Sequence, residues 1–456
     1  MTAPTHQTPR APIRALGLPG ALSANVLNMI GIGPFITIPL ALAAMGGPQA
    51  MLGWAVGALL SLCDGLVWAE LGSALPHSGG PYHYLQQAFG PTGLGRLFSF
   101  VFLWQTLLIG PLSIASGAVG FADYAGYLAP HAAHWQLIAV AAAVCLVNTV
   151  LLYRDVRLIQ TISVITTVVV LGATLWIIIS GVTHFNPALA FDFPPGAFAP
   201  TGAFWAGLGS ATLIAVYDYG GYNNVCLLGE EVRDAPRTIP RAVIGSIVII
   251  AVLYFALNLS ILGALPWRTA QHSSAIVSEF MRQVYGTWGG ILVTVLILIA
   301  SWGSVLAMLL GYSRVPYAAA ADGRFFKVFA ILHPRGHFPT LGLLYMGLLG
   351  ALSCAFSLSD LIAVLIVIQT MFQFAAQCIA VMLLRRRAGS PGRFRMPFFP
   401  LPALIALGGW VYVTVTSKPR HLLIGAAMLL AGAAVFLLQA RRQGRWPFQG
   451  AWVPLA

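Results

Sequence analysis

Charged side chains are scarce in this sequence, making up 8% of its 456 residues, whereas hydrophobic residues make up 58%. In an average soluble domain about a quarter of the residues are charged, because a surface in water must be polar. The mean hydropathy of +0.83 points the same way. This composition excludes a soluble enzyme and favours a chain whose outer surface faces lipid.

Cysteine is rare as well. The five cysteines are an odd number, and each lies alone in an apolar segment with no second cysteine or histidine at a short spacing. This pattern excludes a disulfide framework and a zinc site. We expect no metal ion, no cofactor and no catalytic residue. We interpret the cysteines as small core residues: Cys63, Cys145, Cys226, Cys354 and Cys378.

Long apolar runs are what the sequence has in abundance. Each can cross about 30 Å of hydrocarbon as a helix, and it must be helical because lipid offers backbone groups no hydrogen-bonding partner. The sequence therefore predicts an all-α integral membrane protein of about twelve transmembrane helices. The predicted spans are 16–46, 48–74, 96–128, 135–153, 157–181, 202–230, 241–265, 287–321, 339–357, 360–385, 399–416 and 421–440.

Basic residues outnumber acidic residues by 24 to 12, which gives a formal net charge of +12. They lie in short connections between the apolar runs and do not line one face, so we expect no nucleic-acid partner. If the first segment is cytoplasmic, all but four of the 24 lie on that side; the exceptions are Arg268, Arg282, Lys418 and Arg420. The positive-inside rule then predicts a multi-pass protein of the inner (cytoplasmic) membrane with both termini in the cytoplasm.

The segments outside the spans differ in composition. Residues 1–15 are rich in Pro and Thr and have no apolar stretch, so they predict a disordered cytoplasmic tail and not a signal peptide. Residues 76–95 are amphipathic and glycine-rich, typical of a short interfacial or re-entrant piece. Residues 182–201 have no Lys or Arg and predict an ordered extracellular loop, and residues 441–456 predict a second cytoplasmic tail.

The first and sixth spans are interrupted near their middles. In the first, Gly31, Gly33 and Pro34 fall where a helix should be continuous, and in the sixth Gly220 and Gly221 do the same. Glycine alone often only allows close packing of membrane helices. Two breaks five spans apart, however, are typical of transporters that hold a substrate near the midplane between two interrupted helices.

An interrupted helix exposes free N–H groups on one half and free C=O groups on the other, with dipole ends of about half a charge each. A zwitterion fits this arrangement without any charged side chain. We expect a substrate carboxylate to bind the N–H groups of Ile32 and Gly33. We expect its ammonium to bind the carbonyls of Met29, Tyr217 and Gly220.

Asp218 places a carboxylate beside the second break. A carboxylate near the membrane centre costs about 2.5–3.5 kcal/mol on insertion scales, so it normally marks function. Three roles remain open: pairing with a second cationic group on a basic amino acid or polyamine, carrying a proton, or capping the outer half of the sixth helix. In the second span, we interpret Asp64 as hydrogen-bonded inside the bundle and Glu70 as interfacial.

Several motifs resemble those of the amino acid, polyamine and organocation transporter superfamily. Residues 229–242 (GEEVRDAPRTIPRA) look like its loop after the sixth helix, and residues 313–318 (SRVPYA) followed by Asp322-Gly323 look like its segment after the eighth. The Gly31-Ile32-Gly33 break, residues 219–223 (YGGYN) and residues 332–335 (LHPR) are similar to its L-type amino acid branch. The resemblance covers nearly the whole chain.

The resemblance implies a LeuT-like fold of two inverted five-helix repeats with broken helices 1 and 6, and transport by alternating access. The corresponding units are the tail 1–15, the first repeat 16–181, the extracellular loop 182–201, the second repeat 202–385, two additional helices in 386–440 and the tail 441–456.

The resemblance also bears on single residues. It implies that Tyr217 closes over the bound substrate and that Asn223 lies beside the unwound segment, whereas Ile32 departs from a family pattern of small or hydroxylated residues. We also consider that Trp104 and Gln105 could face the site. The predicted substrate site comprises Met29, Gly31, Ile32, Gly33, Tyr217, Asp218, Gly220 and Asn223.

The coupling ion remains open. Several related carriers have a lysine in the fifth helix that replaces a sodium ion or carries a proton, but no Lys or Arg occurs between Leu158 and Gly181. Ser301 and Ser304 could bind sodium, although hydroxyls in membrane helices more often bond to their own backbone. Proton coupling, sodium coupling and exchange without a coupling ion are all compatible with the sequence.

The leading hypothesis is a secondary transporter, either a permease or an exchanger, that moves amino acids across the cytoplasmic membrane. A polyamine or basic amino acid transporter is the alternative, because of Asp218. A channel should have polar rings along a continuous pore, and a receptor should have a soluble signalling domain. Both are less favoured, and we expect no enzymatic activity.

Overall fold

The computed structural model describes residues 16–76, 80–90, 93–154, 158–321, 323, 325–333, 338–388 and 393–442. The predicted tail 1–15 and nearly all of the predicted tail 441–456 lie outside these residues, as do Asp322, Pro334 and Arg335 of the family motifs. Within the described part of the chain the regular secondary structure is helical, and two isolated β-bridges are the only extended pairings.

Twelve helical segments follow the twelve predicted spans. They are α1 (Leu18–Met29) with α2 (Gly33–Met45), α3 (Met51–Ala74), α5 (Leu94–Leu128), α6 (His134–Arg154), α7 (Leu158–Thr183), α9 (Gly202–Tyr219) with α10 (Asn224–Leu227), α11 (Ala235–Leu262), α14 (Thr287–Ala321), α15 (Thr340–Ser353), α16 (Leu358–Ile368) with α17 (Ala375–Ala388), α18 (Leu401–Val415) and α19 (Pro419–Arg442). Among the described residues, eight of these segments are long and apolar enough to cross a membrane, and α1 with α2 passes the same test as one bent span. The all-helical membrane fold is therefore confirmed.

Short elements lie between or within the spans. They are η1 (Pro48–Ala50), α4 (Pro81–Phe89), α8 (Pro187–Ala190), η2 (Gly229–Glu231), α12 (Trp267–Ala270), α13 (Ile276–Tyr285), η3 (Lys327–Ala330) and the π-helical turn η4 (Gln369–Phe374). The helix α4 occupies the amphipathic stretch predicted after the second span. By contrast, α13 was not predicted. It buries Ile276, Phe280 and Met281. Its ten residues are too few to form the long apolar run from which spans were predicted.

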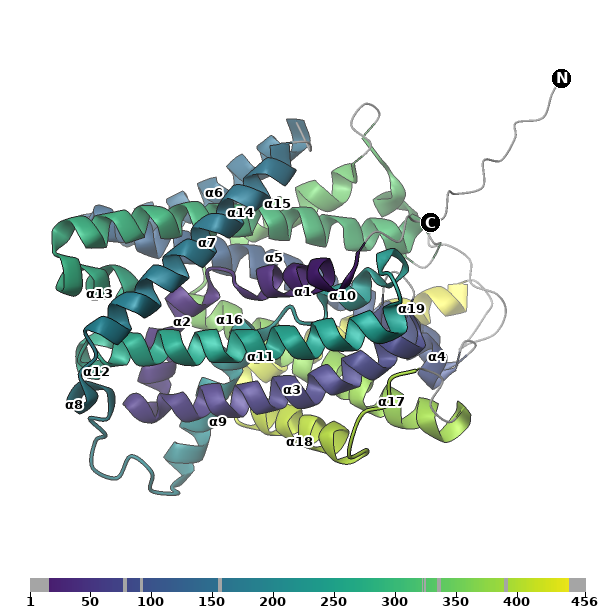
Figure 1. The fold of residues 1–456 in the computed structure, drawn as a ribbon. Helices are drawn as coiled ribbons and strands as arrows, with labels where there is room; N and C mark the ends of the chain where they lie inside the picture. The colour runs from purple at the N-terminus through teal and green to yellow at the C-terminus, as the bar shows by residue number, and fades with distance from the viewer. Residues whose placement is uncertain are drawn as a thin grey trace.

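The interrupted spans lie in the middle of the molecule. Figure 1 shows α1 and α2 between α14 on one side and α11 on the other. The helix α2 packs on α9, α1 packs on α11, and α9 and α11 both pack on α3. Trp54, Tyr219 and Tyr254 join α3, α9 and α11 through ring contacts with centroids 5.5 to 6.2 Å apart. Such aromatic contacts hold these three helices around the breaks.

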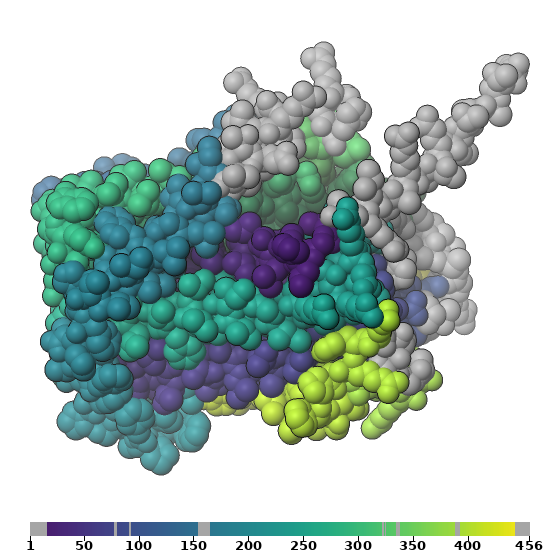
Figure 2. All heavy atoms as spheres, viewed as in Figure 1, coloured from purple at the N-terminus to yellow at the C-terminus, as the bar shows by residue number. Residues whose placement is uncertain are grey.

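Large apolar side chains are exposed on the peripheral helices. Examples are Val150 on α6, Val168 on α7, Val252 on α11, Leu292 on α14 and Leu430 on α19. Figure 2 shows α7 and α11 at the surface of the molecule. An apolar exterior of this extent is a liability in water but suits lipid.

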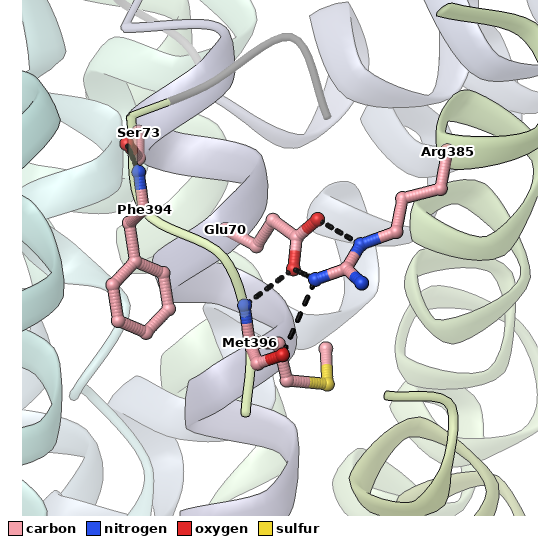
Figure 3. Close-up of polar contacts among 5 residues, drawn as sticks. All are labelled: Glu70, Ser73, Arg385, Phe394 and Met396. Carbon is pink, nitrogen blue, oxygen red and sulfur yellow. Dashed lines mark hydrogen bonds and ion pairs between the residues drawn. The ribbon is translucent and has the colours of Figure 1, made fainter. Parts of the chain in front are cut away.

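At one end of the bundle, Glu70 on α3 forms an ion pair with Arg385 on α17 (Figure 3). The guanidinium donates from Nε to Oε1 at 2.5 Å and from Nη2 to Oε2 at 2.6 Å, and the N–H of Met396 donates to Oε2 at 2.9 Å. The interfacial depth of Glu70 in the membrane stays a prediction, but its side chain is only 2% exposed and so is buried within the protein. The reason is long-range: the segment before α18 folds back over this carboxylate and buries it.

Candidate substrate site

The first span is interrupted between Met29 and Gly33. The helix α1 ends at Met29, α2 begins at Gly33, and the two helices are bent by 49° relative to each other. Ile30 has ψ +72°, outside the helical region, and the N–H of Gly31 reaches the carbonyl of Met29 at 3.0 Å. Pro34, at the start of α2, has no N–H with which to continue the α1 ladder. The first predicted break is confirmed.

The sixth span is interrupted between Tyr219 and Asn224. Gly220 is extended, with ψ +145°, and Gly221 has φ +110°, a value that glycine adopts without strain. A Cβ added to Gly221 would lie 2.8 Å from Nδ2 of Asn28. The second predicted break is therefore confirmed, and its backbone is packed directly against α1.

Asn25 on α1 holds the second break in place. Its Nδ2 donates to the carbonyl of Tyr222 at 2.6 Å, and its Oδ1 accepts from the N–H of Val225 at 2.9 Å. These bonds satisfy two backbone groups that unwinding leaves without helical partners. Asn25 is fully buried and is absent from the predicted site, although an amide within an apolar span is itself a signal of function.

Tyr254 on α11 connects the two breaks. Its hydroxyl lies 2.6 Å from the carbonyl of Met29 on the first span and 3.2 Å from the carbonyl of Asp218 on the sixth, so its single proton is shared between the two oxygens. The Met29 carbonyl, predicted to bind a substrate ammonium, thus already accepts from Gly31 and Tyr254. Tyr254 was not predicted, because tyrosine in a membrane helix has no local pattern that separates such a role from packing.

Asp218 is buried at the first break as well as the second. It is 3% exposed, and its Oδ2 accepts a hydrogen bond from the hydroxyl of Thr37 on α2 at 2.5 Å. Its Oδ1 lies so close to Gly33 that a Cβ on that residue would overlap it. Oδ1 has no hydrogen-bond partner among the residues that the structure describes. The carboxylate therefore lies against the first turn of α2.

One of the three roles considered for Asp218 is wrong. The amino-terminal end of α9, the outer half of the sixth helix, is capped by Thr201, whose Oγ1 accepts from the N–H of Phe204 at 3.2 Å. Asp218 lies in the last turn of α9 and does not cap it. Carboxylates are stabilised at the positive, amino-terminal end of a helix dipole, and the helix that offers its amino-terminal turn to Asp218 is α2.

Tyr217 lies across the first break. Its hydroxyl is 2.8 Å from the hydroxyl of Ser116 on α5, and its ring is 3.5 Å from where a Cβ on Gly33 would be. Its carbonyl accepts from the N–H of Gly220 at 3.2 Å. Asn223 lies beside the second break at the start of α10. The substrate-closing role of Tyr217 and the substrate contact of Asn223 stay predictions.

The two serines considered for sodium have different surroundings. The hydroxyl of Ser301 is buried and donates to the carbonyl of Gly117 on α5 at 3.0 Å. The hydroxyl of Ser304 lies next to the first break, 3.8 Å from where a Cβ on Gly31 would be. No group of three or more His, Cys, Asp or Glu side chains that could hold a metal ion occurs in the described part of the chain. A sodium site at Ser301 and Ser304 stays a prediction.

Trp104 and Gln105 do not face the breaks. The Nε1 of Trp104 donates to the carbonyl of Met428 on α19 at 3.1 Å, and the Nε2 of Gln105 donates to Oε1 of Gln373 in η4 at 3.0 Å. Both side chains therefore join the third span to the tenth and twelfth spans. Their predicted place at the site is wrong, because the apolar run shows that α5 is a helix but not which neighbours it has.

The breaks are open on one side and closed on the other. Asn28 and Gly220 are exposed, as are Ala307 and Gly311 on α14. Ala307 and Gly311 share a helix face with Ser304, so an exposed stripe leads along α14 to the first break. Beyond that break, Ile32 and Ile36 on α2 are buried against Gly120 of α5.

Asp64 on α3 is fully buried, and its carboxylate anchors a residue of the second break. Its Oδ2 accepts from the hydroxyl of Tyr222 at 2.5 Å, and its Oδ1 accepts from Nε1 of Trp410 on α18 at 3.1 Å and from the thiol of Cys378 at 3.8 Å. The interpretation of Asp64 as a carboxylate hydrogen-bonded inside the bundle is confirmed.

Comparison with known proteins identifies the family of the chain. A family model described as amino acid permease matches residues 16–437, which is most of the chain. The chain belongs to the amino acid permease family. An uncharacterized transporter of Mycobacterium tuberculosis is 32% identical to this family member over 337 residues, covering 73% of this chain and 72% of the relative.

Two relatives with assigned activities extend the comparison. The serine/threonine exchanger SteT of Bacillus subtilis is 25% identical, covering 94% of this amino acid permease family member and 98% of the relative. The mouse protein named cationic amino acid transporter 4 is 27% identical over 80% of this chain. This chain spans 59% of the length of that mouse protein and 60% of its human counterpart.

Proposed function

We propose that this protein is a secondary transporter that carries amino acids or related organic amines across the cytoplasmic membrane by alternating access. The observation that carries the proposal is the pair of interrupted helices held face to face by Asn25 and Tyr254. Such breaks present helix ends of opposite dipole sign to a small charged substrate at the midplane of the membrane. The activities named for the relatives, cationic amino acid transport and serine/threonine exchange, belong to the same class.

The one-sided exposure of the breaks supports alternating access over a channel. Gly220 is exposed, whereas Ile32 on the other side of the first break is fully buried. A channel needs a continuous polar path. A transporter needs a site that is open to one side at a time, and the stripe on α14 provides one such opening. By the positive-inside rule, that opening and both termini face the cytoplasm.

The test is uptake of labelled substrates into proteoliposomes, with Gly31→Val as the site variant. A Cβ on Gly31 meets only Ser304 Oγ at 3.8 Å and the Gly33 nitrogen at 4.0 Å, so valine should fold there while filling the space between the breaks. The matched control is Gly172→Val on α7, where a Cβ meets nothing within 4 Å. We expect saturable uptake that Gly31→Val abolishes and Gly172→Val retains.

Three further outcomes decide the mechanism. Acceleration of uptake by unlabelled substrate inside the vesicles would support a carrier, because the loaded site returns faster than the empty one. Flux that does not saturate would favour a channel, and binding without flux would favour a receptor; either would refute the proposal. Repeating uptake with a sodium gradient, a proton gradient and neither would identify the coupling ion.

A further inference from the structure

We infer that Asp218 takes the place of a substrate carboxylate at the first break, so that the preferred substrates are organic amines without a carboxylate next to the amine. This inference rests on the proposed transport function and adds the substrate class. It is carried by the position of Asp218 against Gly33 and Thr37, and by the unpartnered oxygen of its carboxylate.

The carboxylate of Asp218 occupies one face of the first turn of α2. Gly33 and Thr37 are four residues apart and therefore share that face. Thr37 donates to Oδ2 at 2.5 Å, and Oδ1 lies beside Gly33. The amino-terminal end of α2 carries the partial positive charge of the helix dipole, and the carboxylate of Asp218 already balances that charge.

A substrate carboxylate bound at the N–H groups of Ile32 and Gly33 would therefore lie next to a second carboxylate. Like charges that share a buried site repel strongly, because the surroundings screen them little. The helices that form the breaks, α1, α2 and α9, contain no Lys or Arg that could compensate two negative charges. The position predicted for a zwitterion's carboxylate is thus unfavourable while Asp218 is ionised.

The second carboxylate oxygen of Asp218, Oδ1, can instead accept a hydrogen bond from a substrate donor. Oδ1 is buried, and no donor reaches it from the part of the chain that the structure describes. Buried acceptors without donors are rare in native proteins, because each costs the desolvation of that group. A substrate ammonium has three N–H donors and a positive charge, so it can satisfy Oδ1 and still bond to carbonyls at the breaks.

Tyr217 and Gly220 complete the proposed ammonium site. The ring of Tyr217 adjoins Gly33 on the same side as Oδ1, with its Cε1 3.5 Å from where a Cβ on Gly33 would be. Gly220 is exposed, so the backbone of the second break is accessible at this residue. The geometry therefore assigns Asp218 as the residue that determines specificity, with Thr37 positioning its carboxylate.

The experiment compares substrates that differ only by the carboxylate. Proteoliposomes of the full chain are given ornithine or putrescine, and leucine or isoamylamine, each in competition with labelled putrescine. We expect each amine to compete at a concentration at least about tenfold lower than its amino acid, since one hydrogen bond to a charged group corresponds to about a tenfold change in affinity or more.

Asp218→Asn and Asp218→Ala should reverse this order, with putrescine uptake falling at least about tenfold and leucine uptake rising. Both variants remove a buried carboxyl group with an unpartnered oxygen, so they are expected to fold, and thermal melting checks this. Thr37→Val should weaken putrescine uptake without reversing the preference, and Thr37→Ser should restore it. That rescue separates positioning of the carboxylate from a structural role of the side chain.

The outcomes distinguish this inference from the proposed function. Tighter competition by ornithine and leucine than by their amines, unchanged in Asp218→Asn, would overturn the inference and leave transport intact. Amino acid uptake that requires an inward proton gradient and Asp218 would also overturn it, because Asp218 would then be a proton carrier. No saturable uptake of either class, and no ligand-induced thermal stabilisation, would refute both.

Discussion

Tyr254→Phe tests whether the link between the two breaks matters for binding. The substitution removes one hydroxyl that lies 2.6 Å from the Met29 carbonyl and 3.2 Å from the Asp218 carbonyl, and it keeps the ring. The Met29 carbonyl retains the N–H of Gly31, whereas the buried Asp218 carbonyl loses the hydroxyl. Because a buried carbonyl left without its donor costs about 1–3 kcal/mol, we expect a loss of that size in the free energy of unfolding.

The loss can be measured by thermal melting of the purified protein. With ~2.1 cal/mol/K of unfolding entropy per residue, a loss of 1–3 kcal/mol over 456 residues lowers the melting midpoint by about 1–3 °C. Tyr124→Phe on α5 is the matched control, because its buried hydroxyl donates to the carbonyl of Phe35 at 2.8 Å, within α2 and away from the bridge between the breaks. It should cost about 1 kcal/mol.

Substrate binding separates the two variants. We expect Tyr254→Phe to weaken binding of the transported substrate about tenfold, because misplaced binding groups lose much of their preorganised interaction. Tyr124→Phe should bind within about twofold of the unmodified protein. The reasoning would be refuted if both variants lost similar stability and both bound substrate normally, since Tyr254 would then be a packing residue.

Three further predictions concern stability and can be checked by denaturation of the purified variants. Glu70→Gln leaves Arg385, whose side chain is 18% exposed, without its carboxylate and should cost up to about 3–5 kcal/mol, whereas Asp234→Asn, in an exposed ion pair, should cost less than about 1 kcal/mol. Gly221→Ala should cost about 1–3 kcal/mol, because its φ of +110° strains any residue with a Cβ; Gly172→Ala, within a helix and free of neighbours, should be neutral or stabilising. Asp64→Asn weakens a carboxylate with three side-chain donors, so a loss of about 2 kcal/mol is expected, and an unchanged protein would contradict its structural role.

The helices and their breaks were predictable because their causes are local. Lipid requires each apolar run to be helical, so the predicted span 287–321 coincides with α14. Gly33 and Pro34 interrupt the first span because proline lacks an N–H. Gly221 interrupts the sixth because glycine alone adopts its φ without strain. These properties belong to single residues and their neighbours in the sequence.

The contacts across the breaks were not predictable from such properties. Tyr254 and Met29 are 225 residues apart, Asn25 and Tyr222 are 197 apart, and Thr37 and Asp218 are 181 apart. Each pair includes a polar group within an apolar helix. Such a group requires a hydrogen-bonding partner, but the local sequence does not indicate which residue that partner is. The burial of Glu70 was not predictable for the same reason, because a distant segment covers it.

The sequence alone thus determined that this chain spans a membrane as helices and where two of those helices break. Only the tertiary structure decided that Asp218 lies against the first turn of α2 and that one hydroxyl bridges both breaks. The physical reason is that burial and helix breaking depend on local composition, whereas the partner of a buried polar group depends on how the helices pack.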